Sequence, residues 1–513
     1  MSVLSRWLIR RHAKTRSRRL IEALARETIP FETPSAVTFV VPRPQVPAQN
    51  VLHLPPFEPV SEVRPQELPF LSVLQVSDLL RRGQLTAGEL ARTFLERSAR
   101  FGPGLCCVVT LLAERAQAAA ARADDELARD RCRSPLHGIP WGVKDLFSVR
   151  GYPTTWGAEA YRQQRFDHDA AVVERLDEAG AVCLAKLSTD ALGAGDSGRW
   201  FGGMTRNPWK PETSAGGSSG GPASAVAAGL AYFAIGTETV GSTIVPAHRC
   251  GVLGLRPTFG RISRFGSMPG TANLDRVGIF ARHAADAALV LAALQGQDER
   301  DPASQSVLFR FQPRADGLRG LRIGVDQPSF APGQPAAEAG EAFLAGMRRL
   351  GVELVPIALP GPPPRVLAEV KTIEGLFTLL HQRGAEGLGG NGALPQIPPE
   401  LARLASAVDY MQLCRLREHQ IQLVAEQLHE QGIDAYVSGV TLRDGDSREI
   451  HHDFYRSNLT GLPALAIPTG LDREGLPTGV MLTARWWRED LLLEAAHGWQ
   501  SVNSFHTQRP PGS

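Results

Sequence analysis

The chain has 513 residues, of which 43% are hydrophobic and 21% charged, and its formal net charge is +2 at pH 7. This apolar content is typical of a globular protein with a large buried core, and it excludes disordered and fibrous classes. With a net charge so close to zero, the protein as a whole does not attract nucleic acid or anionic membranes electrostatically. We therefore expect a small-molecule substrate and no nucleic-acid partner. No stretch approaches the roughly 20 apolar residues of a membrane span.

The N-terminal part of the sequence is predicted to lie outside the main fold. Residues 1–30 are rich in arginine, with no acidic residue before Glu22. They are expected to form a basic peripheral helix or, alternatively, an organelle transit peptide, which is also Arg-rich and poor in acids. Recurring prolines in residues 31–67 predict an extended arm. Six cysteines without disulfide or metal-site spacing favour a reducing, cytoplasmic compartment.

Globular patterning begins near residue 68 and continues to residue 510, which we expect to be one catalytic domain. Helical spacing predicts helices at 72–82, 86–100, 113–129, 170–179, 221–229, 284–295, 337–350 and 403–430. Short apolar runs predict strands at 138–143, 181–184, 231–235, 321–325, 435–437, 464–468 and 480–483. Thr86 with Glu89 three residues later predicts a capping box.

This alternation predicts an α/β fold, with a large mixed sheet covered by helices on both faces. Residues 311–435 are less regular, with Pro-rich and Gly-rich stretches. Such segments usually form surface loops, and we expect this region to shape the substrate entrance.

A segment rich in glycine and serine gives the strongest chemical signal. It runs from Ser214 to Ala225 with the sequence SAGGSSGGPASA. Glycines at this density let the backbone approach a ligand closely, and they place Ser218 in an exposed turn. A flexible linker would not continue into a helix and a strand. A phosphate-binding loop needs a lysine after the last glycine, which this segment lacks.

Two further segments contain a second serine and a lysine. Ser242 follows a glycine after a predicted strand, where backbone N–H groups can point into the same space as the hydroxyl, as an oxyanion hole requires. Lys144 ends the apolar segment HGIPWGVK. Apolar surroundings disfavour the ammonium form, so this amine can act as a base. Taken singly, each segment also fits a structural role, as a strand-to-helix turn or as a lysine that reaches the surface.

Together the three segments resemble the amidase-signature family, and the resemblance extends over roughly residues 68–510. Further shared motifs follow in the family's order: TRNPW from Thr205, CGVLGLRPTFGR from Cys250, LDRVG from Leu274 and NLTGLPA from Asn458.

The resemblance implies an amidase that hydrolyses the C–N bond of a small-molecule amide, outside peptide bonds, through a serine acyl-enzyme and without a cofactor or a metal. Its Ser-cisSer-Lys triad maps onto Ser242 as the nucleophile, Ser218 as the bridging serine after a cis peptide, and Lys144 as the base. A serine nucleophile needs such an adjacent base because its own pKa is high.

The resemblance also implies supporting groups around the triad. Gly217 would accommodate the cis peptide, and Ser219 would hold Lys144 by a hydrogen bond. The oxyanion hole would consist of the backbone N–H groups of Thr239, Val240, Gly241 and Ser242.

The nucleophile loop departs from the family pattern T-D-T-G-G-S-I-R at several positions. Glu238 replaces the aspartate, Val240 a glycine and Ile244 the arginine. If that arginine pairs with the acid in the family, Glu238 needs another partner, and we expect Arg249 or Arg256. The bulk of Val240 is expected to reshape the acyl pocket or to redirect the backbone.

Several alternatives stay open from the sequence. His137 and His248 lie near the motifs but are expected in structural turns, so a His-dependent triad is disfavoured. His451, His452 and Asp453 suggest a metal only weakly. Within the family, the chain could instead be a glutaminase-type subunit of a tRNA-dependent amidotransferase, although the arginine segment expected for glutamine binding is missing. A catalytically silent binding protein on the same fold is the third alternative, and a homodimer is left open.

Overall fold

The computed structural model describes residues 50–60, 62–313, 317–334, 336–360, 369–375, 377–378, 406–440 and 452–513. The expected basic helix and the first part of the Pro-rich arm therefore lie outside the described residues, as do His451 and the side chains of His452 and Asp453. Within the arm, Val51–Leu52 (β1) pairs in parallel with Arg310–Phe311 (β12). The end of the arm therefore contains a short paired strand, which the prolines did not predict.

An eleven-stranded mixed sheet forms the centre of the described part of the chain, in the order β14-β13-β15-β17-β16-β10-β11-β9-β3-β4-β2. The strands are β2 (Val108–Leu111), β3 (Pro140–Lys144), β4 (Val182–Leu187), β9 (Phe233–Glu238), β10 (Leu253–Arg256), β11 (Arg276–Ala281), β13 (Arg322–Asp326), β14 (Glu353–Ile357), β15 (Ala435–Gly439), β16 (Ala464–Leu471) and β17 (Pro477–Ala484). Most of them are buried, because the sheet is covered on both faces.

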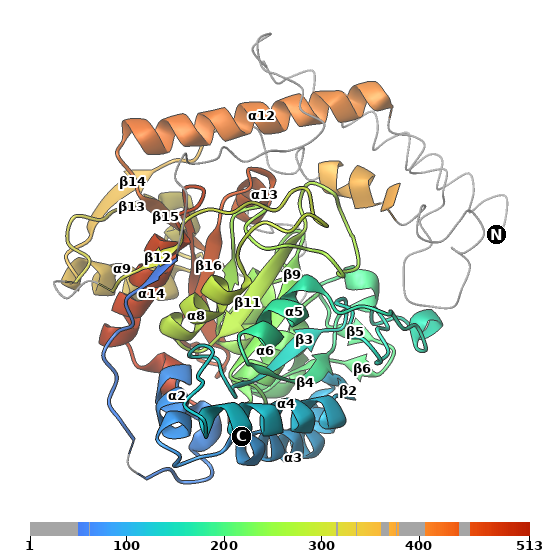
Figure 1. Ribbon diagram of the computed structural model, residues 1–513. Helices are drawn as coiled ribbons and strands as arrows, with labels where there is room; N and C mark the ends of the chain where they lie inside the picture. Colours follow the sequence, from blue (N-terminus) through green and yellow to red (C-terminus); the bar gives the residue numbers. More distant parts are fainter. Residues whose placement is uncertain are drawn as a thin grey trace.

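The longer helices surround this sheet (Figure 1). They are α2 (Val73–Arg81), α3 (Ala87–Leu105), α4 (Ala113–Leu127), α5 (Ala171–Glu178), α6 (Gly220–Ala227), α7 (Ile244–Cys250), α8 (Ala284–Leu294), α9 (Ala337–Arg349), α12 (Ala407–Glu430), α13 (His452–Leu459) and α14 (Glu489–Val502). Figure 1 shows α12 across one end of the molecule and α3 and α4 at the other. The predicted α/β class is confirmed.

The expected capping box is present at the start of α3. The Thr86 hydroxyl accepts a hydrogen bond from the amide of Glu89 at 3.1 Å, and the Glu89 carboxylate accepts one from the amide of Thr86 at 3.0 Å. These bonds satisfy amide donors that have no partner inside the helix, so the helix begins where the sequence predicts.

The pairing of β3 with β9 and β4 sets the position of the catalytic candidates. β3 and β9 are parallel, with Val143 opposite Ile235. The carboxyl end of β3 therefore lies beside Gly236 and Thr237 near the end of β9. Parallel strands bring their carboxyl ends to one edge of a sheet, which is where side chains gather for chemistry.

Membrane spans and metal clusters are both absent from the described residues. None of their helices is long and apolar enough to cross a bilayer. In the same part of the chain, no group of three or more His, Cys, Asp or Glu side chains is arranged to hold a metal ion.

A buried ion pair lies between β4 and the end of β3. The Lys186 ammonium is 2.7 Å from the Asp145 carboxylate, and neither side chain is exposed to solvent. Lys186 also donates to the Thr154 hydroxyl at 2.7 Å. Removing one member of such a pair leaves a buried charge without compensation.

We expect Lys186→Met to lower the free energy of unfolding by about 3–5 kcal/mol, because Asp145 would stay buried without its cation. Urea unfolding followed by circular dichroism measures this loss. Lys210→Met is the matched control, since Lys210 is partly exposed and 3.5 Å from Glu474, and such surface pairs contribute about 0–1 kcal/mol. Equal losses in the two variants would contradict the importance of burial.

Candidate active site

Lys144 is the last residue of β3, and its side chain is fully buried. Its amine lies 2.7 Å from the Ser218 hydroxyl and 2.8 Å from the Thr237 hydroxyl. The sheet register brings Thr237 to this position, and the turn before α6 brings Ser218. The structure therefore places two of the three predicted triad residues in direct contact.

Ser218 belongs to a tight turn that ends at the N-terminus of α6. The Gly217–Ser218 peptide bond is cis, as the family resemblance implies. The carbonyl of Ser218 accepts a hydrogen bond from the amide of Asp190 at 3.2 Å. A Cβ atom on Gly217 would lie 1.8 Å from Oδ2 of Asp190. Only glycine fits at position 217 beside this carboxylate.

Ser242 lies next to the same turn. Its carbonyl accepts a hydrogen bond from the amide of Ser219 at 3.2 Å, and the residue is 8% exposed. Its hydroxyl has no hydrogen-bond partner in the described part of the chain. The backbone amides of Thr239, Val240, Gly241 and Ser242 likewise donate to no described residue. A nucleophile candidate thus lies beside a group of unused N–H donors.

Ser219 does not bond Lys144, contrary to expectation. Its hydroxyl donates to the carbonyl of Thr237 at 3.0 Å and accepts from the amide of Thr237 at 3.3 Å. Thr237, which the sequence did not single out, is instead the second partner of Lys144. Ser219 therefore supports the lysine through the backbone of β9.

The electrostatic surroundings of Lys144 favour its neutral form. Burial lowers the pKa of Lys144 to about 7, and the carboxylates of Asp190, Asp275 and Glu238 oppose this effect in that order. A lysine taken out of water loses the hydration of its ammonium group, which lowers its pKa. Near neutral pH a substantial fraction of the amine is therefore available to accept a proton.

Glu238 pairs with an arginine from outside the nucleophile loop, since the loop itself has Ile244 in place of an arginine. Its carboxylate is 3.0 Å from the Arg256 guanidinium, and both side chains are fully buried. Asn458 donates to the same carboxylate at 3.0 Å. The other carboxylate oxygen accepts from the amides of Thr243 at 2.6 Å and Ile244 at 3.1 Å. Of the two predicted arginines, Arg256 takes the role, and Glu238 fixes the chain immediately after Ser242.

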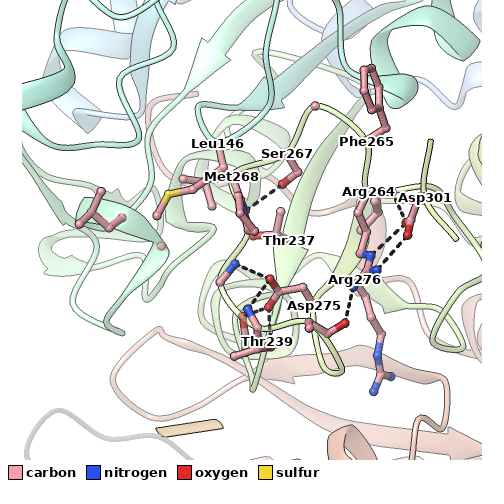
Figure 2. Close-up of a pocket in the computed structure, with 18 of the residues that line it drawn as sticks. Leu146, Thr237, Thr239, Arg264, Phe265, Ser267, Met268, Asp275, Arg276 and Asp301 are labelled. Atoms are coloured by element: carbon pink, nitrogen blue, oxygen red, sulfur yellow. Dashed lines mark hydrogen bonds and ion pairs between the residues drawn. The ribbon is translucent and has the colours of Figure 1, made fainter. Parts of the chain in front are cut away.

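A cavity of about 300 Å³ opens beside Thr237 and Thr239 (Figure 2). Its apolar lining comes from Leu146, Leu192, Phe265, Met268 and Val277. Val240 is not among the described lining residues; its side chain packs against the main hydrophobic core instead. The substitution at position 240 thus changes core packing and not the wall of this cavity.

Asp275 fixes one wall of the cavity to the nucleophile loop (Figure 2). Its carboxylate accepts from the Thr239 hydroxyl at 2.7 Å, from the Thr271 hydroxyl at 3.0 Å, and from the amides of Gly270 and Thr271 at 2.6 and 2.7 Å. Four donors leave this carboxylate well satisfied. The loop of residues 270–275 and the residues before Ser242 therefore hold each other in place.

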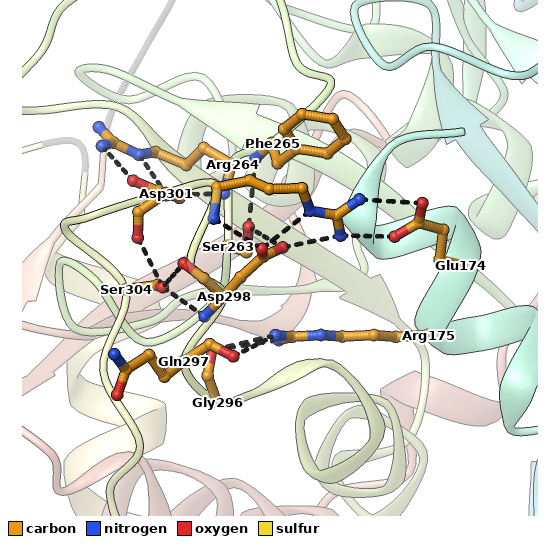
Figure 3. Close-up of polar contacts among 11 residues, drawn as sticks. Glu174, Arg175, Ser263, Arg264, Phe265, Gly296, Gln297, Asp298, Asp301 and Ser304 are labelled. Atoms are coloured by element: carbon orange, nitrogen blue, oxygen red, sulfur yellow. Dashed lines mark hydrogen bonds and ion pairs between the residues drawn. The ribbon is translucent and has the colours of Figure 1, made fainter. Parts of the chain in front are cut away.

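A set of ion pairs holds the outer part of the same wall (Figure 3). Arg264 binds Asp301 at 2.9 Å, and Arg300 binds both Glu174 of α5 at 2.6 Å and Asp298 at 2.9 Å. The Arg300 guanidinium also lies 4.0 Å from the centre of the Phe265 ring. These contacts fasten the cavity wall to the rest of the fold.

His137 has the structural role that the sequence predicts. It is buried, its Nδ1 accepts from the amide of Arg133 at 3.1 Å, and its Nε2 lies 3.2 Å from the Glu126 carboxylate. His248 lies in α7, after the nucleophile loop.

We expect Gly217→Ala to lower the free energy of unfolding by about 3 kcal/mol, because the new methyl group would overlap the buried Asp190 carboxylate. Gly104→Ala is the matched control, since a Cβ atom there meets no neighbour within 4 Å. Thermal or urea unfolding measures both. A Gly217→Ala protein as stable as the control would show that the turn adapts without cost.

Comparisons with known proteins agree with this geometry. A model of the family described as Amidase matches residues 89–438. One subunit of the glutamyl-tRNA(Gln) amidotransferase of Halorhodospira halophila is 35% identical over 86% of this chain and 99% of that protein. The crystal structure of peptide amidase from Stenotrophomonas maltophilia has a TM-score of 0.75 and 32% identity, covering 86% of this chain and 98% of that chain.

A second solved structure, described in connection with the origins of an s-triazine catabolic enzyme, has a TM-score of 0.76 and 30% identity over 84% of this chain and 98% of that chain. The family model matches more than half of the chain, and the relatives align over nearly their whole length. The chain belongs to the amidase family.

Proposed function

We propose that this protein is a serine-dependent amidase in which Ser242 attacks the amide carbonyl, Ser218 relays the proton and Lys144 accepts it. The observation that carries the proposal is the contact of 2.7 Å between the buried Lys144 amine and the Ser218 hydroxyl. A serine hydroxyl is a weak nucleophile until an adjacent base removes its proton, and a neutral lysine is such a base.

In the proposed reaction these groups act in turn. The Ser218 hydroxyl gives its proton to Lys144 and takes the proton of Ser242, whose oxygen forms a bond to the carbonyl carbon. The unused amides from Thr239 to Ser242 stabilise the negative oxygen of the tetrahedral intermediate. Ser218 next delivers its proton to the leaving nitrogen as the C–N bond breaks, and Lys144 returns a proton to Ser218. A water molecule then gives a proton to Ser218 while Ser218 gives one to Lys144, and the water oxygen bonds to the acyl carbon. The bond to the Ser242 oxygen breaks, Ser218 and Lys144 return the protons, and the acid is released.

We assign the acyl group of the substrate to the cavity beside Thr237 and Thr239, which borders the triad although no triad residue is among its described lining residues. Its lining favours an uncharged acyl group. All three arginines in its described lining are engaged: Arg264 with Asp301, Arg300 with Glu174 and Asp298, and Arg276 with backbone carbonyls that include Leu462 at 2.9 Å. A substrate carboxylate would have to displace one of these partners. A neutral carboxamide with an apolar chain fits the lining without such a loss.

A second candidate is supported by the curated relatives. The proteins from Halorhodospira halophila and Anaeromyxobacter dehalogenans, the latter 36% identical over 80% of this chain, are subunits of glutamyl-tRNA(Gln) amidotransferase. On that basis the same triad would release ammonia from glutamine within a larger assembly. Glutamine carries a carboxylate, and so the engaged arginines are evidence against this candidate.

We expect Lys144→Ala to abolish both amide hydrolysis and covalent labelling of Ser242 by a fluorophosphonate probe, because no base would remain. In the wild-type protein, kcat/KM should rise about tenfold per pH unit up to pH about 7 and then level off, since only the neutral amine accepts a proton and burial lowers the pKa of Lys144 to about 7.

Ser242→Ala is the control for probe specificity in this experiment. Substantial turnover by a folded Lys144→Ala protein would overturn the proposed base. A folded wild-type protein that shows no labelling at Ser242 would favour a catalytically silent binding protein.

A substrate panel separates the two candidates. We expect the isolated protein to hydrolyse neutral aliphatic or aryl carboxamides, and to hydrolyse glutamine with kcat/KM lower by about tenfold or more, the effect of one missing charge-assisted hydrogen bond of about 1.5 kcal/mol. Ammonia release is measured with and without the other subunits of a glutamyl-tRNA(Gln) amidotransferase. Glutamine hydrolysis that depends on those subunits would establish the second candidate instead.

A further inference from the structure

Asp190 is the third residue after the end of β4 and is 2% exposed. Its Oδ1 accepts hydrogen bonds from the Arg199 amide at 2.7 Å and from the Ser197 hydroxyl at 3.2 Å. Its own amide donates to the Ser218 carbonyl at 3.2 Å. One buried residue thus bonds both the turn that carries Ser218 and the segment of residues 197–199.

The other oxygen of this carboxyl group is unusual because it has no hydrogen-bond partner among the described residues, although it is buried. It faces Gly217, where a Cβ atom would lie 1.8 Å away. A buried carboxylate oxygen without a hydrogen-bond donor lowers the stability of the folded protein. A functional role in the site would explain why Asp190 is nevertheless present. Burial also raises the pKa of Asp190 to about 6, while its hydrogen bonds and the charge of Lys144 oppose the rise.

The two other carboxylates that act on Lys144, and the lysine of the neighbouring strand, are already paired within the described residues. Asp275 accepts four hydrogen bonds, Glu238 is bound to Arg256, and Lys186 on the neighbouring strand is bound to Asp145. Of the carboxylates that act on Lys144, Asp190 has the strongest influence. Of these three carboxylates, Asp190 is the one with a buried oxygen that has no hydrogen-bond partner among the described residues.

We propose that Asp190 is a positioning residue: its amide holds the turn whose Ser218 hydroxyl contacts Lys144, and its buried carboxylate places a negative charge beside that turn. The ionised carboxylate stabilises the lysine ammonium, and without this charge the amine is neutral at a lower pH. Lys144 is thus kept from becoming too weak a base. The catalytic consequence rests on the proposed function, whereas the electrostatic coupling of the two residues does not.

The coupling can be measured without any substrate. Lysine occurs at positions 14, 144, 186, 210 and 371, so a protein labelled with carbon-13 at the lysine ε-carbons gives few NMR signals, and Lys144→Met assigns the one of interest. We expect Asp190→Asn to lower the titration midpoint of Lys144 by about one pH unit, because an opposite charge nearby is lost. An unchanged midpoint in a folded variant would overturn the proposal.

Asp286→Asn is the matched control. Asp286 is also a buried carboxyl group, but it lies on α8 and accepts from the Val73 amide at 3.0 Å. We expect this variant to leave the midpoint of Lys144 unchanged. An equal shift in both variants would overturn the proposal, because it would show a general effect of buried charge or of reduced stability.

If Asp190→Asn fails to fold, the wild-type protein still provides the test. The Lys144 signal should show an additional inflection near pH 6, where Asp190 ionises, and a single inflection would overturn the coupling. Where both variants fold, the acidic limb of kcat/KM should move to lower pH in Asp190→Asn alone. A wild-type protein without turnover would count against the proposed function, while the NMR result would still decide the role of Asp190.

Discussion

The burial of one lysine amine is the constraint on which the rest of the site depends. Lys144 is fully buried at the end of β3, and its hydrogen-bond partners among the described residues are the hydroxyl groups of Ser218 and Thr237. Desolvation brings its pKa to about 7. A surface lysine would stay protonated at neutral pH and could not accept a proton. The sheet therefore contributes to the proposed chemistry, because it buries this amine away from water.

The polar groups around the lysine serve mainly to hold neighbouring segments. Glu238 binds the amides that follow Ser242, Asp275 binds the residues that precede it, and Asp190 binds the Ser218 turn. Glu238 and Asp275 make these contacts with their carboxylates, whereas Asp190 holds the Ser218 turn with its own amide. All three carboxylates also oppose the lowering of the Lys144 pKa. Fixed donors near a developing oxyanion need no reorganisation during the reaction, which is how such sites stabilise a transition state.

The regular elements were largely predictable from the sequence, because apolar periodicity reports burial directly. The central strands β10 and β11 were missed as strands. They contain Gly254, Gly278, Arg256 and Arg276, which interrupt the apolar run. Their context explains these residues: a Cβ atom on Gly254 would lie 2.4 Å from Ala247 of α7, and Arg256 binds Glu238 inside the sheet. Close contacts and buried ion pairs leave no periodic pattern in the sequence, so apolar periodicity could not reveal these two strands.

The sequence by itself determined the α/β class and the three segments that carry Lys144, Ser218 and Ser242, because these depend on local composition and on the order of motifs. Only the tertiary structure decided which groups meet. In the folded chain Glu238 pairs with Arg256, and Lys144 bonds the Thr237 hydroxyl where Ser219 was expected. The Asp190 carboxyl group lies against Gly217. Each of these contacts joins residues far apart in the chain, and strand register and packing, not local pattern, set their distances.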